Sequence, residues 1–174
     1  MTAGPHSWPD GLTLRHDLRP GDLGRVIALH GEVYSQWSGF GVEFEAFVAR
    51  TIAEYGLENE FNGRIWLLER GACEDERELV GCCAIAFRSE GLAQLRWVLL
   101  HPQLRGGGLG RGLVETALDY CRESGVERVY LETTDGLDAS SALYRKFGFQ
   151  EVSNEVVPMW REPRPLIRME RRLK

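Results

Sequence analysis

The chain has 174 residues, 43% of them hydrophobic and 27% charged, which suits one ordinary globular domain. Its formal net charge of −5 opposes binding to a phosphate backbone, so no nucleic-acid partner is expected. No stretch is apolar enough to cross a bilayer, and the start lacks the apolar run of a secretory signal, so we expect a cytoplasmic protein without a membrane partner. The four cysteines lack C-x-x-C spacing and the four histidines are scattered, so no metal is expected either.

The first half of the chain is typical of a strand followed by two helices. Apolar and polar residues alternate over residues 12–16, which predicts a half-buried strand. Asp22 is a good N-cap, and the apolar residues of 23–34 recur at helical spacing after it. Residues 36–41 are predicted to form a loop, and 44–55 a second amphipathic helix. The aromatic stripe of that helix belongs either to the core or to the wall of a substrate pocket.

The second half predicts a meander of strands and then alternating helices and strands. Three consecutive strands with short turns favour antiparallel pairing. The predicted elements are strands at 64–69, 78–87, 92–100 and 129–133, a helix that begins at Leu109, a helix that Asp138 can cap, and final strands from 149 and at 166–171. Gly125 can end the helix that begins at Leu109. We expect residues 1–11 to form a flexible tail and residues 12–174 a single domain.

The most informative segment is residues 98–111, where a strand runs through a glycine-rich turn directly into the amphipathic helix. Glycines let backbone N–H groups approach a ligand closely, and the start of a helix attracts anions. The turn lacks the Lys and hydroxyl residue of a Walker loop, and its glycines do not fit the G-x-G-x-x-G spacing of a dinucleotide fingerprint. The segment predicts a phosphate site of another kind; a tight turn that only packs the helix is the alternative.

Two motifs resemble those of the GNAT family of N-acetyltransferases. Arg105-Gly106-Gly107-Gly108-Leu109-Gly110 is similar to the family's [QR]-x-x-G-x-[GA] pyrophosphate loop, and residues 142–149 are similar to its Leu-Tyr-x-x-x-Gly-Phe signature. Leu95-Arg96-Trp97 and Gly136-Leu137-Asp138 look similar to members found alone or fused to MarR-type regulators. Only a short tail precedes the first strand, so we expect no DNA-binding module.

The resemblance implies an α/β (α+β) fold: a mixed, mostly antiparallel twisted sheet of about six to seven strands flanked by about four helices. It also implies acetyl-CoA as acyl donor, with no metal. The residues implied to bind this cofactor are Val98, Leu99, Leu100, Arg105, Gly106, Gly107, Gly108, Leu109, Gly110 and Arg111. The resemblance further implies that the strand around residues 98–100 bulges or diverges from the next strand, which leaves its backbone free to bond the pantetheine arm.

Tyr144 matches the family tyrosine that hydrogen-bonds the CoA sulfur. Because the reference pKa is near 10 for a phenol and about 8.5 for a thiol, we favour a hydrogen-bond donor over complete proton transfer to the thiolate. The alternative is a core tyrosine packed beside Phe147.

The acceptor side departs from the family pattern. Arg96 stands where some relatives carry a carboxylate that removes the proton of the amine. Its side chain could instead pair with a carboxylate of the substrate. Arg96, Glu32 and Tyr34 are the residues predicted to bind the substrate. The base is left open, because each carboxylate could equally be a solvated surface group and a water chain would serve as well. The candidate carboxylates are Glu32, Glu43, Glu45 and Glu132. Leu137 stands where relatives often carry Asn.

The function implied is transfer of the acetyl group of acetyl-CoA to the amine of a small molecule, by direct attack in a ternary complex. A protein or peptide N-acetyltransferase and a non-catalytic acyl-CoA sensor stay open as alternatives. The expected partners are coenzyme A and a small amine, and a homodimer is compatible with the sequence.

Overall fold

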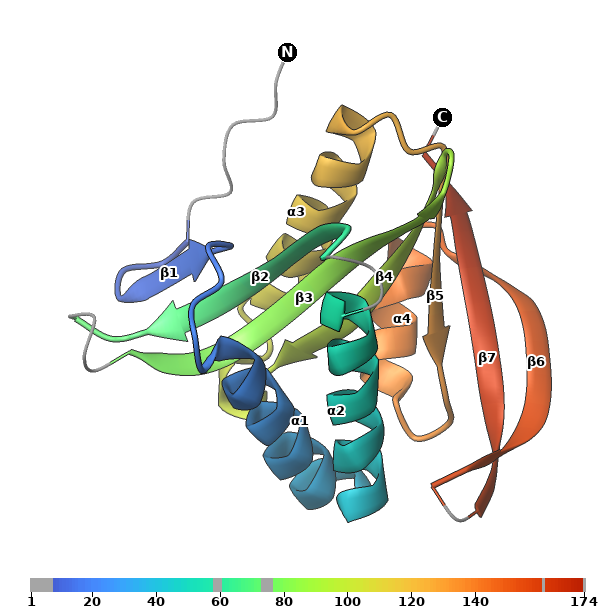
Figure 1. Ribbon diagram of the computed structural model, residues 1–174, viewed down its shortest axis with the longest axis horizontal. Coiled ribbons are helices and arrows are strands. Elements are labelled where there is room, and N and C mark those ends of the chain that lie inside the picture. Colours follow the sequence, from blue (N-terminus) through green and yellow to red (C-terminus); the bar gives the residue numbers. More distant parts are fainter. Residues whose placement is uncertain (1–7, 58–60, 73–76, 161, 174) are drawn as a thin grey trace.

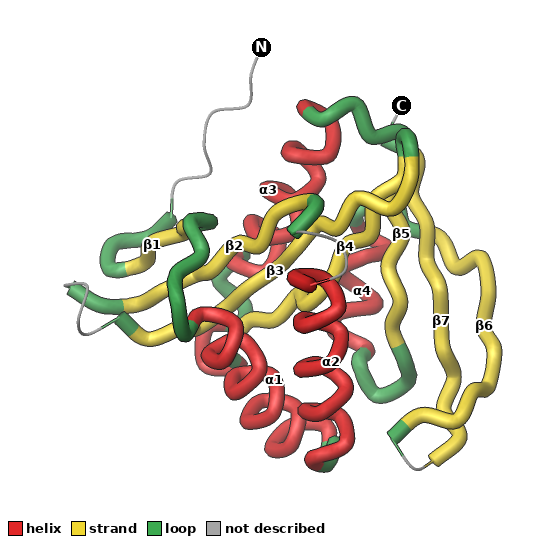
Figure 2. Tube along the Cα trace, in the orientation of Figure 1, coloured by secondary structure: helices red, strands yellow, loops and turns green. Residues whose placement is uncertain are grey.

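The computed structural model describes residues 8–57, 61–72, 77–160 and 162–173, in which one mixed sheet is flanked by helices (Figures 1 and 2). The elements in chain order are β1 (Leu12–Arg15), α1 (Asp22–Ser38), α2 (Val42–Leu57), β2 (Gly63–Arg70), β3 (Glu78–Ser89), β4 (Leu92–Leu100), a 3-10 turn (Pro102–Leu104), α3 (Leu109–Glu123), β5 (Arg128–Thr133), α4 (Asp138–Lys146), β6 (Gln150–Met159) and β7 (Glu162–Arg172). The strand order is β1-β2-β3-β4-β5-β7-β6, and among these described strands only the β4–β5 pair is parallel. The predicted mixed, mostly antiparallel sheet with helices on both sides is confirmed.

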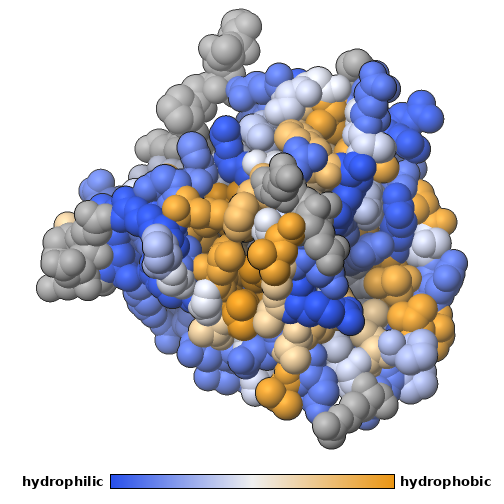
Figure 3. All heavy atoms as spheres, viewed as in Figure 1, coloured by the Kyte–Doolittle hydropathy of each residue, from blue (hydrophilic) through white to orange (hydrophobic). Residues whose placement is uncertain are grey.

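The central strands of the sheet are buried on both faces, with α1 and α2 on one side and α3 and α4 on the other (Figure 1). Consecutive strand residues point to opposite faces, so the apolar run of β2 supplies two cores at once. Trp66 and Leu68 pack in the core that contains α3, whereas Ile65 and Leu67 pack in the core that contains α1 and α2. Figure 3 shows hydrophobic residues gathered at the middle of the α1–α2 face, with hydrophilic residues around them.

Two helix starts differ from the prediction by one residue. The N-cap of α1 is Gly21, in the left-handed conformation at φ 98°, and the N-cap of α4 is Leu137. Asp22 and Asp138 are instead the first helical residues, so their prediction as N-caps is wrong. Tertiary structure explains the first case, because the Asp22 carboxylate is buried and bonds Arg15.

The loop predicted at residues 36–41 is shorter in the structure. Helix α1 continues to Ser38, so the prediction is wrong for residues 36–38. Gly39 is the C-cap of this helix; it adopts a φ of 67° and donates its N–H to the Tyr34 carbonyl oxygen. Glycine is the residue that most readily adopts this conformation, and no strong helix breaker precedes it.

The start of the chain is described from Trp8 onwards, so residues 1–7 of the predicted tail lie outside the described residues, as does Cys73. The Trp8 side chain packs against the hydrophobic core, and the Leu12 amide donates to the Pro9 carbonyl oxygen at 3.0 Å. Among the described residues, no helix combines the length and apolar character needed to cross a bilayer.

Strand β4 bulges at its centre and then leaves β5. Ala84 pairs with Arg96 and Cys82 with Leu99, so two β4 residues oppose a single β3 residue. Trp97, one of those two, has a φ of 46°, which is rare for a bulky side chain. Pairing of β4 with β5 extends only over residues 92–94. The predicted divergence of β4 is therefore present, and its backbone beyond Gln94 has no ladder partner in β5 within the described strands.

Candidate active site

The loop between β4 and α3 forms an open cradle of backbone amides. Gly106 and Gly108 adopt φ values of 91° and 81°, a conformation that favours glycine. A Cβ built on Gly106, Gly107 or Gly108 would meet no atom within 4 Å. The cradle is thus open to a ligand and is not a turn sealed beneath other side chains.

The start of α3 adds further amides to this cradle. The first intrahelical bond joins the Gly112 amide to the Gly108 carbonyl oxygen at 3.0 Å, and no side chain caps Gly108. The amides of residues 109–111 therefore have no acceptor within the helix, and the helix dipole is positive here. This arrangement suits an anion such as a diphosphate.

The other predicted residues of this loop surround the cradle in different ways. Arg105 and Arg111 are exposed, and Arg111 lies 4.0 Å from Glu115 one helical turn on. The Leu109 side chain is buried, so only its backbone can serve a ligand. Gly110 lies where α3 approaches its neighbours, because a Cβ there would lie 3.8 Å from Leu143 and 3.9 Å from Leu100.

The predicted strand residues 98–100 lie beside this cradle on the diverging part of β4. Leu99 and Leu100 pair with β3 on one side, and the Leu99 side chain is buried among α1 and α2 residues. Val98 lines a cavity between the diverging strands. The backbone that faces away from β3 is therefore available to an extended ligand arm.

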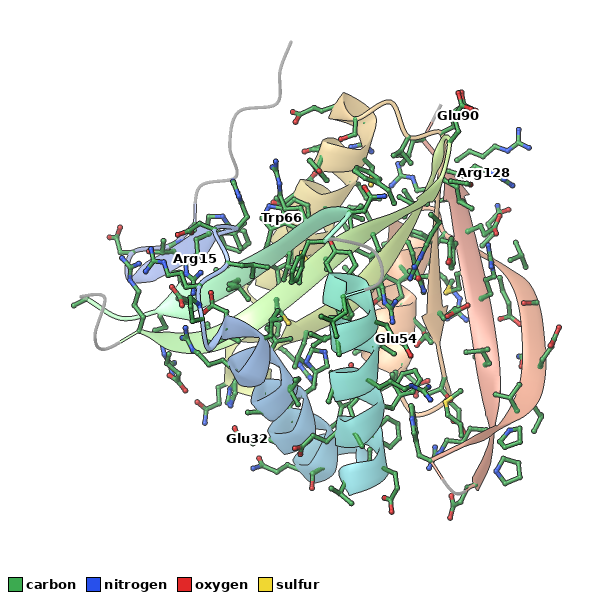
Figure 4. All side chains as sticks on the ribbon, in the orientation of Figure 1. Arg15, Glu32, Glu54, Trp66, Glu90 and Arg128 are labelled. Carbon is green, nitrogen blue, oxygen red and sulfur yellow. The ribbon has the colours of Figure 1, made fainter. Side chains whose placement is uncertain are left out.

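The cavity has a volume of about 160 Å³ and lies between β4, β5 and the surrounding helices and hairpin. Four predicted site residues line it, namely Tyr34, Arg96, Val98 and Tyr144. Glu32 does not line it; its side chain is exposed on α1 (Figure 4). The helical period explains the difference, because residues 30 and 34 share one face of α1 and residue 32 lies on the other. The structure thus gives no support to Glu32 as a substrate-binding residue.

Tyr144 is 7% exposed and projects from α4 into the cavity wall. Burial raises its pKa above the usual value, and the nearby Tyr34 and Cys83 add to the effect. The phenol is therefore protonated at neutral pH. Its hydroxyl makes no hydrogen bond within the described part of the chain, so it is free to donate to a ligand in the cavity.

The side chains of Arg96 and Glu132 give the cavity two opposite charges. The Arg96 guanidinium carbon lies 4.7 Å from the centre of the Trp97 ring, and burial lowers the Arg96 pKa, aided by Arg88 and opposed by Glu132. Glu132 accepts a hydrogen bond from Gln94 Nε2 at 3.3 Å. Gln94 Oε1 in turn accepts a hydrogen bond from Arg88 Nε at 3.0 Å. Of the four carboxylates predicted as candidate bases, Glu132 is the one that lines the cavity.

Sequence analysis missed His30 as a cavity residue. Its Nδ1 donates to the Val26 carbonyl oxygen at 2.8 Å, and burial lowers its pKa to about 4. The imidazole is neutral near pH 7 and is a poor acceptor for a proton. The signal was present in the sequence, because His30 falls on the predicted apolar face of the first helix.

Trp160 was also missed, since it reaches the cavity from the distant β6–β7 hairpin. Its ring centre lies 4.8 Å from that of Phe40, 4.9 Å from that of Phe44 and 5.9 Å from that of Phe47. Its φ is 49°, and its buried indole nitrogen has no hydrogen-bond partner in the described structure. The prolines at 158 and 163 mark the hairpin turn in the sequence, but only the tertiary structure places Trp160 against α2 and against Phe40, which precedes α2.

Comparison with known proteins is consistent with this site. The model of the acetyltransferase (GNAT) family matches residues 32–149. An uncharacterized N-acetyltransferase of Chlorobaculum tepidum is 34% identical over 87 residues, which cover 49% of this chain and 53% of that protein. An IAA acetyltransferase of Azospirillum brasilense is 39% identical over 74 residues, covering 42% and 48%. The chain thus aligns with about half the length of these curated relatives.

A structural comparison supports the same fold over nearly the whole chain. An acetyltransferase from Streptococcus agalactiae has a TM-score of 0.73 at 20% identity, covering 95% of this chain and 100% of that one. The family model spans the strand divergence, the amide cradle and Tyr144. The chain therefore belongs to the acetyltransferase (GNAT) family.

Proposed function

We propose that the protein transfers the acetyl group of acetyl-CoA to the primary amine of a small molecule, by direct attack within a ternary complex. The observation that carries this proposal is the placement of two features along one strand. The open amide cradle lies just after the end of β4, and the Tyr144 phenol lines a cavity that opens where β4 leaves β5.

The residues present fit an extended acyl-CoA. The cradle amides around residues 106–110 would hold the diphosphate, with Arg105 and Arg111 exposed beside them. The unpaired side of β4 at residues 98–100 would bond the pantetheine amides, as a peptide does when it adds to a sheet edge. Binding energy from these distant groups would position the thioester in the cavity. Acetyl-CoA would supply the activated acyl carbon.

Transfer requires an amine without its extra proton and a stabilised leaving thiolate. The amine nitrogen forms a bond to the acyl carbon as the carbon–sulfur bond breaks. Glu132 is the candidate to receive the amine proton, directly or through water, because it is the one acidic residue among the described residues that line the cavity. Tyr144 would donate a hydrogen bond to the thiolate, since its raised pKa disfavours complete proton transfer.

The size of the cavity favours a small acceptor. An apolar cavity of about 150 Å³ holds a single benzene ring, and this cavity has a volume of about 160 Å³. Trp160, Phe44 and Phe47 form an aromatic part of its lining. A small amine therefore fits better than the extended backbone of a peptide.

Replacement of Tyr144 by Phe tests the proposal. We expect kcat for CoA release with an accepted amine to fall by about 10²-fold, because the thiolate loses its donor. The Kd of acetyl-CoA, measured by calorimetry, should stay within twofold. Tyr120→Phe is the matched control, since Tyr120 stacks on Phe87 and lies outside the cavity.

Unchanged turnover in Tyr144→Phe would contradict the role of the phenol. A protein that binds CoA but releases no thiol with any amine of a broad panel would contradict the enzyme itself and indicate an acyl-CoA sensor.

A further inference from the structure

We infer that the acceptor is an α-amino acid with an aromatic or large apolar side chain, whose carboxylate binds Arg96 while its amine lies beside Glu132. This inference rests on the proposed function and adds the substrate class to it. Three independent features of the cavity carry it: an unpaired cation, the register of the two charges, and an aromatic wall.

The first feature is the lack of an anionic partner for Arg96. Within the described part of the chain, no carboxylate lies within 4.0 Å of its guanidinium and no hydrogen bond engages it. It is half-buried on the cavity wall, and burial lowers its pKa. An unpaired charge taken out of water is costly. A guanidinium presents a planar fork of donors that matches a carboxylate, so a ligand carboxylate supplies what the fold does not.

The second feature is the position of Glu132 relative to Arg96. Gln94 pairs with Tyr130, and Arg96 and Glu132 follow two residues later in β4 and β5. Side chains two residues apart share a face of the sheet, so these two project from the same face on either side of the divergence. Glu132 is also among the charges that act on the Arg96 pKa. An α-amino acid carries an ammonium and a carboxylate on one carbon, so it can present one charged group to each of these two side chains.

The same pair of charges argues against other acceptors. A phosphate on Arg96 would place more negative charge near Glu132. A polyamine needs several anionic groups, whereas Glu132 is the one acidic residue among the described residues that line the cavity. A peptide N-terminus has an amide where the amino acid has its carboxylate, and would leave Arg96 unpaired.

The third feature is the aromatic part of the cavity lining. The Trp160 ring centre lies 4.9 Å from that of Phe44 and 5.9 Å from that of Phe47. All three rings line the same cavity as Arg96 and Glu132. An aromatic or branched aliphatic side chain would bury its apolar surface against this wall.

The test compares three amines that differ only in the group on the α-carbon: L-phenylalanine has a carboxylate there, L-phenylalanine amide a neutral carboxamide, and phenethylamine a hydrogen. For the wild-type protein we expect kcat/KM for L-phenylalanine to exceed that for the amide and for phenethylamine by about 10²-fold or more, because a site built for a polar group rejects analogues that lack it. In Arg96→Gln this preference should disappear, mainly through a higher KM for L-phenylalanine.

Arg128→Gln is the matched control. It makes the same charge change on β5, but at the end of the strand far from α1 and α2 (Figure 4), where Arg128 is exposed and lies 3.9 Å from Glu170. It should keep the wild-type preference. In both variants, the Kd of acetyl-CoA should stay within twofold of the wild-type value.

The possible outcomes distinguish a wrong substrate class from a wrong transferase activity. Equal use of L-phenylalanine and its amide by the wild type, or an unchanged preference in Arg96→Gln, would overturn the substrate class and leave the transferase intact. Faster acetylation of a dipeptide such as Phe-Gly, or of spermidine, would also overturn it. No turnover of any amine by a protein that binds acetyl-CoA would refute the proposed function itself.

Discussion

Arg15 and Arg96 are two arginines withdrawn from solvent in very different surroundings. The Arg15 side chain is 8% exposed, near the edge of the sheet (Figure 4), and bonds Asp22 at 2.6 and 2.8 Å and Glu69 at 2.9 and 3.0 Å. Arg96 has the face of Trp97 beside it and no described carboxylate within reach. Arg15 joins β1, α1 and β2, and two carboxylates neutralise its charge. Arg96 lines the cavity and has no carboxylate partner among the described residues. We therefore expect the first to serve stability, and we have proposed that the second serves ligand binding.

The pKa shifts of the groups follow the same division. Hydrogen bonds to Asp22 and Glu69 raise the pKa of Arg15. Burial alone would raise the pKa of Asp22. The hydrogen bonds from Arg15 and from the Arg19 amide outweigh this effect, so the Asp22 pKa is lowered. Arg96 shows the opposite balance, because burial lowers its pKa and no bond compensates.

The largest effect should come from breaking the paired cluster. Arg15→Met leaves the buried carboxylates of Asp22 and Glu69 without their main partner, so we expect the free energy of unfolding to fall by about 3–5 kcal/mol. Urea denaturation followed by circular dichroism measures this.

Arg50→Met is the control for that experiment, because the Arg50 side chain is 66% exposed in its ion pair with Glu54 and should change stability by less than about 1 kcal/mol. Should Arg15→Met fail to fold, Arg15→Lys retains one charge and gives an intermediate loss. A loss below about 1 kcal/mol in either Arg15 variant would show that the cluster does not support the fold.

An intermediate effect should come from His30, a buried cavity group with no carboxylate partner among the described residues. Its pKa is about 4 in the folded protein, against 6.5 for an unperturbed histidine, so the unfolded chain binds a proton first as pH falls. The contribution of His30 to stability therefore decreases from about pH 6.5 down to about pH 4, by about 2 kcal/mol between pH 7 and pH 5.

Stability curves of the wild type and His30→Gln across that range test this prediction. The neighbouring Tyr34 does not titrate there, because burial raises its pKa to about 12. Because the pKa values of Asp22 and Glu69 are lowered in the folded state, acidification also reduces the stability of both proteins through these two carboxylates. The difference between the two slopes thus reports His30, and parallel curves would contradict the prediction.

The smallest effect should come from removing the unpaired cation. Arg96→Met deletes a charge that no described carboxylate compensates and keeps an apolar stem of similar length, so stability should stay constant or rise by up to about 1 kcal/mol. Thermal unfolding without ligand measures the change. A marked loss of stability would place Arg96 beside Arg15 as a structural residue and remove the contrast between them.

Local signals predicted most of the fold because they depend on periodicity and on glycine. The alternation in residues 12–16 and the apolar spacing after Leu109 led to β1 and α3. The errors arose where a long-range contact or a neighbouring residue decided the outcome. Asp22 has the chemistry of an N-cap, but its carboxylate is engaged by Arg15 and Gly21 takes the cap.

The candidate site divides in the same way. The amide cradle at residues 106–110 and the phenol of Tyr144 follow from short motifs, since the turn and its helix are contiguous in the chain. Tyr34 and Glu32 were equally plausible in sequence, and the orientation of α1 decided between them.

The sequence by itself thus determined the order of strands and helices and the open glycine-rich turn before α3, because both arise from residues within a few positions of each other. The tertiary structure alone decided which charges are paired. Arg15 meets Glu69 across 54 residues, Arg96 faces Glu132 where two strands diverge, and Trp160 arrives from a distant hairpin. Such meetings depend on sheet register and helix orientation, which no local pattern specifies.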